Sequence, residues 1–109
     1  NRPQGFLSAE HHGNDLHIYE LSVMQSMQGQ GTGRRLVEAA KDYARSIRLG
    51  FVTLTTFTNV PWNAPFYSRI GFQAKATADL DERLAGILSE EYKHGFAPDS
   101  RCAMAWQVA

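Results

Sequence analysis

The sequence has almost no cysteine, no excess of charge of either sign and no long hydrophobic run. Cys102 is the single cysteine among 109 residues, which excludes an internal disulfide and suits a small, buried apolar residue. Eleven basic residues balance eleven acidic ones, so no field over the whole molecule attracts nucleic acid or an anionic membrane. No apolar run reaches the roughly 20 residues of a membrane span. We therefore expect a protein of a reducing compartment, the cytoplasm, with neither nucleic acid nor a membrane as its partner.

The length of the chain limits the number of domains. The 109 residues can bury a core without support from disulfides or metal ions, but they are too few for two domains. We therefore expect residues 1–109 to form a single domain. The sequence begins at Asn1 rather than at a methionine, so the expected domain includes the alternative of an N-terminal truncation.

Hydrophobic periodicity predicts strands alternating with helices. Strands are expected at residues 5–10, 16–23, 51–57, 72–76 and 101–108, and helices at 34–49, 63–71 and 80–92. Short links join the second strand, the first helix and the third strand. Such a unit predicts a right-handed crossover between two parallel neighbouring strands.

The second predicted strand carries polar groups among apolar ones. Simple alternation places four side chains on each face, with Leu16, Ile18, Glu20 and Ser22 on one and His17, Tyr19, Leu21 and Val23 on the other. A mixed face of this kind indicates, weakly, that the strand contributes to a site.

The segment "MQGQGTGRR" has three glycines, at positions 29, 31 and 33, directly before the first predicted helix. A helix N-terminus presents unpaired backbone N–H groups and a partial positive charge. Glycine permits positive φ and close approach of the backbone to a ligand, so the segment predicts a phosphate site, to which Arg34 and Arg35 would add charge. The simpler alternative is a tight turn followed by two solvated arginines.

Two common phosphate-binding patterns are absent from this segment. A P-loop requires a Gly-Lys-Ser/Thr ending, which is not present, and a dinucleotide-binding turn requires Gly-x-Gly-x-x-Gly. Here the three glycines are spaced by two residues throughout. A P-loop nucleotidase is therefore excluded, and dinucleotide binding is disfavoured.

The run "LSVMQSMQGQGTGRRLVEAA" resembles the acetyl-coenzyme A motif of the GNAT superfamily of N-acetyltransferases. The core of that motif is Gln or Arg, two residues, Gly, one residue, and Gly or Ala, and Gln28, Gly31 and Gly33 meet it. Val23 stands five residues before Gln28, as the strand valine of the family does. Further along, "APFYSRIGF" resembles the second motif of the family, Phe-Tyr followed by Gly-Phe. Two motifs in order, joined by a helix and a strand, are more specific than either alone.

The resemblance implies both a fold and an activity. The fold would be α/β (α+β), with a mixed, mostly antiparallel sheet, a central parallel pair of strands and flanking helices, as in GNAT-like acyl-CoA N-acyltransferases. The activity would be direct transfer of an acetyl group from acetyl-CoA to a primary amine of a small molecule or peptide, in a ternary complex. Dimers are frequent in the family, so a homodimer is compatible with the resemblance.

The resemblance also assigns residues to the coenzyme A site. Those that would hold the pyrophosphate through the backbone are Gln28, Gly29, Gln30, Gly31, Thr32, Gly33 and Arg34. The pantetheine arm would lie beside Val23, Met24 and Gln25, with a main-chain N–H near Met24 serving the thioester oxygen. Either Asn59 or Asn63 would bind the arm from the other side. No metal takes part.

The motif tyrosine is Tyr67, which the resemblance places close to the sulfur as the general acid for the departing thiolate. Its simpler role is that of a core aromatic residue with a satisfied hydroxyl. Phe66, beside it, is counted with the residues that line the coenzyme A site, although packing is its simplest role.

For the general base we favour His17, which stands where some members of the family carry glutamate or histidine. An unperturbed imidazole pKa of about 6.5 suits removal of a proton from an ammonium near neutral pH. Glu20 is the rival. It faces away from His17 by alternation, but a bulge in this strand would shift the phase and expose it. Tyr19 is a candidate lining residue of the acceptor pocket, and a third possibility is that water removes the proton.

Two features set limits to this interpretation. His11, His12 and His94 have no cysteine or carboxylate at zinc-ligand spacing, so a metal site is disfavoured. A strand and two helices that normally precede the matched segment, and that form much of the acceptor pocket, have no counterpart in the sequence. A fragment, a compact member and a wall supplied by a partner chain are the alternatives, and the competing function is a non-catalytic acyl-CoA-binding or assembly module.

Overall fold

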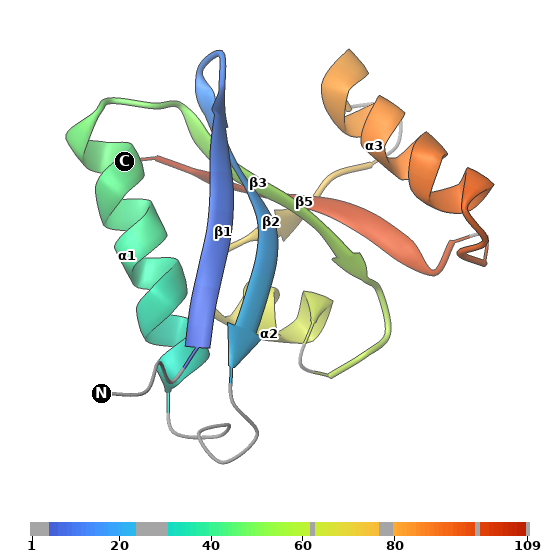
Figure 1. Cartoon of the computed structure of the whole chain (residues 1–109), viewed down its shortest axis with the longest axis horizontal. Coiled ribbons are helices and arrows are strands. Elements are labelled where there is room, and N and C mark those ends of the chain that lie inside the picture. The colour runs from blue at the N-terminus through green and yellow to red at the C-terminus, as the bar shows by residue number, and fades with distance from the viewer. Residues whose placement is uncertain (1–4, 24–30, 62, 77–79, 98, 109) are drawn as a thin grey trace. The chain divides into compact units, whose positions relative to one another are not determined.

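The computed structural model describes residues 5–23, 31–61, 63–76, 80–97 and 99–108. Five strands and three helices follow one another along the chain (Figure 1). Their order is β1 (Gly5–His12), β2 (Asp15–Val23), α1 (Thr32–Ser46), β3 (Phe51–Phe57), α2 (Ala64–Arg69), β4 (Gln73–Ala74), α3 (Glu82–Lys93) and β5 (Arg101–Gln107).

The strands form one mixed sheet with the hydrogen-bonded order β1-β2-β3-β5-β4. β1 pairs with β2, and β4 with β5, in antiparallel fashion. This is the fold class that the sequence predicts. Two compact units divide the chain: Asn1–Val52 with Gln107–Ala109, and Thr53–Trp106.

The first unit is a β-hairpin packed against a helix. Gly13, with φ 56°, and Asn14 form the two-residue turn between β1 and β2, and a positive φ is typical of such a turn. Helix α1 runs along both strands (Figure 1). The buried apolar side chains of this unit are Leu16, Ile18, Val37, Ala40, Ala44, Leu49 and Val52. Burial of these side chains is the main force that holds the hairpin to α1.

The second unit contains most of β3, together with α2, β4, α3 and β5. Its buried apolar side chains are Leu54, Ala64, Tyr67, Phe72, Leu84, Ala103, Met104 and Ala105. Asp81 caps α3, because its side chain accepts a hydrogen bond of 2.8 Å from the backbone N–H of Leu84. β4 is only two residues long, shorter than the strand expected at residues 72–76.

Arg101 joins three elements of the second unit. Its Nε donates to Glu91 Oε1 over 3.0 Å, and its guanidinium lies 4.5 Å from the ring centroid of Phe57 and 4.9 Å from that of Phe96. Thr55 donates a further hydrogen bond, of 2.7 Å, to the Glu91 carboxylate. These contacts fasten α3 to β3 and β5 through one charged group that lies against two rings, which are themselves in contact with their centroids 5.6 Å apart.

Candidate active site

Helix α1 begins directly after Gly31, in the segment predicted to bind the pyrophosphate. Gly31 has φ 80° and ψ 6°, a left-handed conformation that glycine adopts without steric cost. Its carbonyl accepts a hydrogen bond of 3.0 Å from the backbone N–H of Arg35. Within the described part of the chain no side chain caps this end of α1, and its first turn has no acidic residue. Side chains thus leave the first N–H groups of α1 to another acceptor, as a phosphate site requires.

Arg35 folds back over the start of α1. Its Nη2 donates a hydrogen bond of 3.2 Å to Thr32 Oγ1, and a Cβ placed on Gly31 would lie 3.5 Å from its Nη1. Thr32 is buried, whereas Arg34 is exposed. The helix dipole favours negative charge at this end, whereas the first turn of α1 holds two arginines and no acidic residue, so a bound anion would relieve an unfavourable arrangement of charge. The chemistry of this helix start fits a pyrophosphate.

Part of the predicted coenzyme A site lies outside the described residues, namely Met24, Gln25, Gln28, Gly29 and Gln30. Val23 is the last residue of β2 and is half-buried. Gly33 lies inside α1, and of the two described glycines of this segment only Gly31 has a positive φ. The special backbone conformation is therefore needed at Gly31, whereas a small side chain is the property that Gly33 offers.

A β-bulge interrupts the pairing of the hairpin. Ala9 is opposite Ile18, but the next residue towards the N-terminus of β1, Ser8, is opposite Glu20. Tyr19 is therefore the extra residue of β2, and every residue beyond it is shifted by one position. The bulge considered from the sequence is present, and Glu20 is exposed.

The bulge corrects the faces that simple alternation predicts for β2. Paired residues share a face of a sheet, and the polar residues Ser8, Glu10, His12, Asp15, His17, Glu20 and Ser22 fall on one face, together with Phe6. Leu7, Ala9, Leu16, Ile18, Leu21 and Val23 fall on the other, together with His11. A Cβ on Gly5, on this second face, would lie 3.4 Å from Leu36 of α1. The apolar face therefore packs on α1, and His17 and Glu20 lie together on the opposite, polar face.

His17 and Glu20 differ strongly in exposure although they share a face. His17 is 2% exposed, and Tyr19, between them in the sequence, is 51% exposed. The rings of His17 and Tyr19 meet edge to face with their centroids 4.8 Å apart. A buried imidazole beside a half-exposed aromatic ring is an environment that holds a base in a fixed orientation.

Tyr67 lies in α2, in the second unit, and is buried. Its ring meets Phe66 and Phe72, with centroid separations of 5.1 Å and 5.6 Å. Burial raises the pKa of Tyr67 to about 12, because the phenolate loses hydration that the phenol does not need. The ordinary tyrosine pKa of about 10 therefore does not apply to Tyr67. Near neutral pH Tyr67 keeps its proton. It can donate a hydrogen bond, but it is a poor acid.

Asn63 and Asn59, the alternatives for binding the pantetheine arm, have different surroundings. The Asn63 side-chain oxygen accepts a hydrogen bond of 2.8 Å from the hydroxyl of Thr56. Asn63 is half-buried and occupies the N-cap position of α2, as expected, but its side chain does not cap the helix. Asn59 is exposed. The Asn63 amide is therefore fixed by a hydrogen bond, whereas the Asn59 amide is exposed to solvent.

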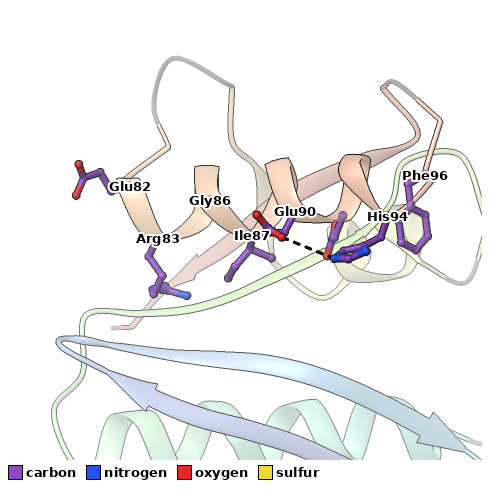
Figure 2. Close-up of a pocket in the computed structure, with 8 residues that line it drawn as sticks. Glu82, Arg83, Gly86, Ile87, Glu90, His94 and Phe96 are labelled. Carbon is purple, nitrogen blue, oxygen red and sulfur yellow. Dashed lines mark ion pairs between the residues drawn. The ribbon is translucent and has the colours of Figure 1, made fainter.

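A surface hollow of about 600 Å³ lies on α3, and none of the residues that line it is one predicted to serve the reaction. Figure 2 shows side chains of α3 and Phe96 around it, including the pair Glu90 and His94, whose carboxylate and imidazole are 3.7 Å apart.

Among the described residues no three of His, Cys, Asp and Glu lie together as metal ligands do. Cys102 is half-buried, and burial raises the pKa of its thiol, which lowers the fraction of reactive thiolate. No helix in the described ranges is long and apolar enough to span a membrane.

The family model "Acetyltransferase (GNAT) domain" matches residues 1–74 of the chain, more than half of its length. The chain belongs to the GNAT acetyltransferase family. The match includes the α1 start, both candidate bases, the held Asn63 and Tyr67. The resemblance identified from the two motifs is therefore confirmed, and it applies to the segment that holds all of the predicted site residues.

Solved structures show the same fold over almost the whole length of this GNAT-family chain. Nourseothricin acetyltransferase is 25% identical with a TM-score of 0.70, over 97% of this chain and 58% of that one. The ribosomal-protein-S18-alanine N-acetyltransferase from Escherichia coli is 15% identical with a TM-score of 0.72, over 97% and 62%. The PaiA N-acetyltransferase from Thermoplasma acidophilum, solved in complex with coenzyme A, is 16% identical with a TM-score of 0.66, over 94% and 52%. The chain thus spans a little over half the length of these structures.

The sequence did not single out one neighbour of the candidate base. His12 was considered only as a metal ligand, but its Nε2 is 2.8 Å from the Tyr19 hydroxyl. Its position on β1, paired with Asp15 across the turn, does not by itself place it beside Tyr19. Alternation from Asp15 already puts Tyr19 on the face of His12, so what the sequence did not give was the reach of the Tyr19 side chain along the strand to His12.

Proposed function

We propose that the protein is an N-acetyltransferase that moves the acetyl group of acetyl-CoA to a primary amine by direct attack. The observation that carries the proposal is the start of α1, where a left-handed Gly31 precedes a helix with no acidic first turn and with Arg35 folded over it. Such an end has the charge and the open N–H groups that a diphosphate requires. The family match over the same residues supports it.

The coenzyme A site proposed here extends from this helix start. Backbone N–H groups of residues 28–34 would hold the pyrophosphate, and Val23, Met24 and Gln25 would line the pantetheine arm. Of the two asparagines, we assign Asn63 to the arm, because Thr56 already holds its side-chain oxygen and leaves the amide N–H groups to be directed at a ligand carbonyl. Asn59 would have to be ordered when the ligand binds, which costs conformational entropy.

Tyr67 is the proposed donor to the departing sulfur. With a pKa of about 12, the phenol stays protonated at neutral pH and supplies a hydrogen bond to the developing thiolate. Full transfer of its proton to a thiolate whose conjugate acid has a pKa of about 8.5 would be unfavourable. Stabilisation of charge at the sulfur is therefore its role, and the proton finally reaches the thiolate from water.

His17 is the proposed base for the incoming ammonium. It is buried beside Tyr19 and shares the polar face of the hairpin with Glu20. A base of fixed orientation removes a proton more effectively than an exposed, mobile carboxylate does. Glu20, exposed on the same face, then serves as the alternative base, and water as the third route.

The acceptor proposed is a small-molecule or peptide amine, in line with the relatives of this fold, and a homodimer is the proposed assembly. A reducing compartment, the cytoplasm, suits a chain with one cysteine.

The test combines binding with chemistry. Saturating acetyl-CoA should raise the melting temperature, because a ligand that binds only the native state stabilises it. Thiol release from acetyl-CoA should then depend on an added amine. A thermal shift without amine-dependent thiol release, across a broad panel of amines and peptides, would instead indicate the non-catalytic acyl-CoA-binding module. The absence of any shift would remove the proposal.

A further inference from the structure

Tyr19, the extra residue of the bulge, lies between two histidines of its own hairpin. Its hydroxyl is 2.8 Å from Nε2 of His12 on β1, and its ring is edge to face with His17 at 4.8 Å and 69°. Exposure falls steeply from Tyr19, which is 51% exposed, to His17, which is only 2% exposed. The Tyr19 ring thus links its contact with His12, at the surface of the hairpin, to the buried imidazole of His17.

Glu10 determines which nitrogen of the His12 imidazole carries the proton at the contact with Tyr19. Its Oε2 is 3.4 Å from the same Nε2 of His12, and a carboxylate only accepts hydrogen bonds. The proton of the His12 imidazole is therefore favoured on Nε2, where the Glu10 carboxylate and the Tyr19 hydroxyl oxygen share it as acceptors. The phenol ring is held at its hydroxyl by His12 and at its edge by His17, which restricts a side chain that is otherwise half in solvent.

We propose that His12 is a positioning residue of the acetyltransferase: by holding the Tyr19 hydroxyl, it keeps the Tyr19 ring against His17 and so fixes the imidazole that serves as base. This inference rests on the proposed function, because it gives His17 its catalytic role. A general base acts only while its nitrogen stays within hydrogen-bond reach of the proton it removes. A ring that limits rotation of the imidazole therefore contributes to the rate without touching the reacting atoms.

A matched pair of variants separates this role from packing. In His12→Gln the side-chain amide reaches the position of Nε2 and can still donate to the Tyr19 hydroxyl. In His12→Asn the amide takes the position of Nδ1 and falls short of it. Tyr19→Phe keeps the ring but removes the hydroxyl that accepts the hydrogen bond. His12→Asn and Tyr19→Phe therefore break the same contact from opposite sides.

Nuclear magnetic resonance of isotope-labelled histidine rings, in the full chain without ligand, tests the positioning directly. The His17 signals, assigned with His17→Gln, should move in His12→Asn and in Tyr19→Phe, and the double variant should move no further, because both changes remove one contact. His12→Gln should restore the wild-type signals, and His94, on α3, should stay constant in all variants. Unmoved His17 signals in His12→Asn, or additive shifts in the double variant, would overturn the proposal.

A kinetic measurement tests the consequence for the reaction. With butylamine, putrescine or an unblocked alanyl peptide as acceptor, His12→Asn should lower kcat/KM for the amine about twofold to tenfold, the effect of losing one hydrogen bond. The KM for acetyl-CoA should not change, and His12→Gln should recover the rate. Wild-type kcat/KM in His12→Asn would overturn the catalytic part. If the wild type acetylates none of these amines, the proposed function fails for them, while the resonance measurement still decides whether His12 positions His17.

Discussion

The hydroxyl of Thr56 donates a hydrogen bond of 2.8 Å to the side-chain oxygen of Asn63. Thr56 is buried in β3 and Asn63 precedes α2, so this bond fixes the orientation of the amide before any ligand arrives. Its two N–H donors are thereby aimed in one direction, which lowers the entropy cost of binding.

Asn63→Ala should weaken the affinity for coenzyme A by about fivefold, corresponding to one hydrogen bond of about 1 kcal/mol. Asn59→Ala should leave the affinity unchanged, because Asn59 is exposed, and Thr56→Val should reproduce part of the Asn63 loss. Isothermal titration calorimetry measures all three. A larger loss in Asn59→Ala than in Asn63→Ala would reverse the assignment.

Two glycine-to-alanine changes should have opposite effects on stability. Gly31→Ala places a side chain at φ 80° and should lower the free energy of unfolding by about 1 kcal/mol, with weaker binding of acetyl-CoA. Gly86→Ala, inside α3 with open space around the new Cβ, should raise it by about 0.5–1 kcal/mol without affecting binding. Urea unfolding and thermal shifts with ligand measure both. Equal stabilisation by the two changes would show that Gly31 needs no left-handed conformation.

Tyr67→Phe should lower turnover while leaving the affinity for coenzyme A nearly unchanged, because the lost hydroxyl acts on the sulfur as charge develops.

The Tyr67→Phe variant should also differ from the wild type in its stability in alkaline solution. The Tyr67 pKa is raised from 10.0 to about 12, so the folded state holds a proton that the unfolded state releases. Stability is therefore full below about pH 10 and falls by about 3 kcal/mol as the pH rises to about 12. The Tyr67→Phe variant should not show this part of the loss of stability, which urea unfolding in alkaline buffers would measure. An unchanged alkaline profile would show that the phenol is not desolvated.

The two candidate bases can be separated by neutral replacements. His17→Gln should lower kcat by about 100-fold or more, the usual contribution of a general base, and Glu20→Gln by no more than about twofold. Since His17 is buried, circular dichroism of each variant is needed to establish that the fold is retained. A large loss in Glu20→Gln alone would identify the carboxylate as the base, and small losses in both would favour water.

Two arginine ion pairs of similar length should differ in strength. Arg45 is only 2.7 Å from Asp42, but both side chains are exposed, and Arg45→Ala should cost less than about 0.5 kcal/mol. Arg101 contacts Glu91 over 3.0 Å and lies against two phenyl rings, with both charged side chains mostly buried, and Arg101→Ala should cost about 2–3 kcal/mol. Chemical denaturation at two salt concentrations compares them. Equal losses would show that the stacking on Phe57 and Phe96 contributes nothing.

Much of the fold follows from local sequence signals. The 51–57 strand and the amphipathic helix after the glycines lie where periodicity predicts them. Element ends were less predictable: β1 continues to His12 and β4 shrinks to two residues. Those ends depend on pairing with a neighbouring strand rather than on the residues themselves.

The candidate site was predictable where a motif specifies it. Gly31 was singled out by the glycine spacing before a helix, and Tyr67 by the resemblance to the second motif, because backbone conformation and chemistry restrict the residue type at those positions. The raised pKa of Tyr67 and the contact of His12 with Tyr19 were not predictable, since burial and side-chain reach arise only in the folded chain. The faces of β2 were predicted wrongly for a single reason, the extra residue at Tyr19.

The shift at Tyr19 bears on how this hairpin is compared with those of other proteins. From Glu20 to Val23, each residue of β2 matches a relative's residue of the same orientation only if that relative has its extra residue at the same place. An alignment without a gap, made against a strand of regular pairing, would equate side chains that contact α1 with side chains on the opposite surface. Position-by-position inference of acceptor preference therefore has to be anchored at the bulge rather than at the ends of the strand.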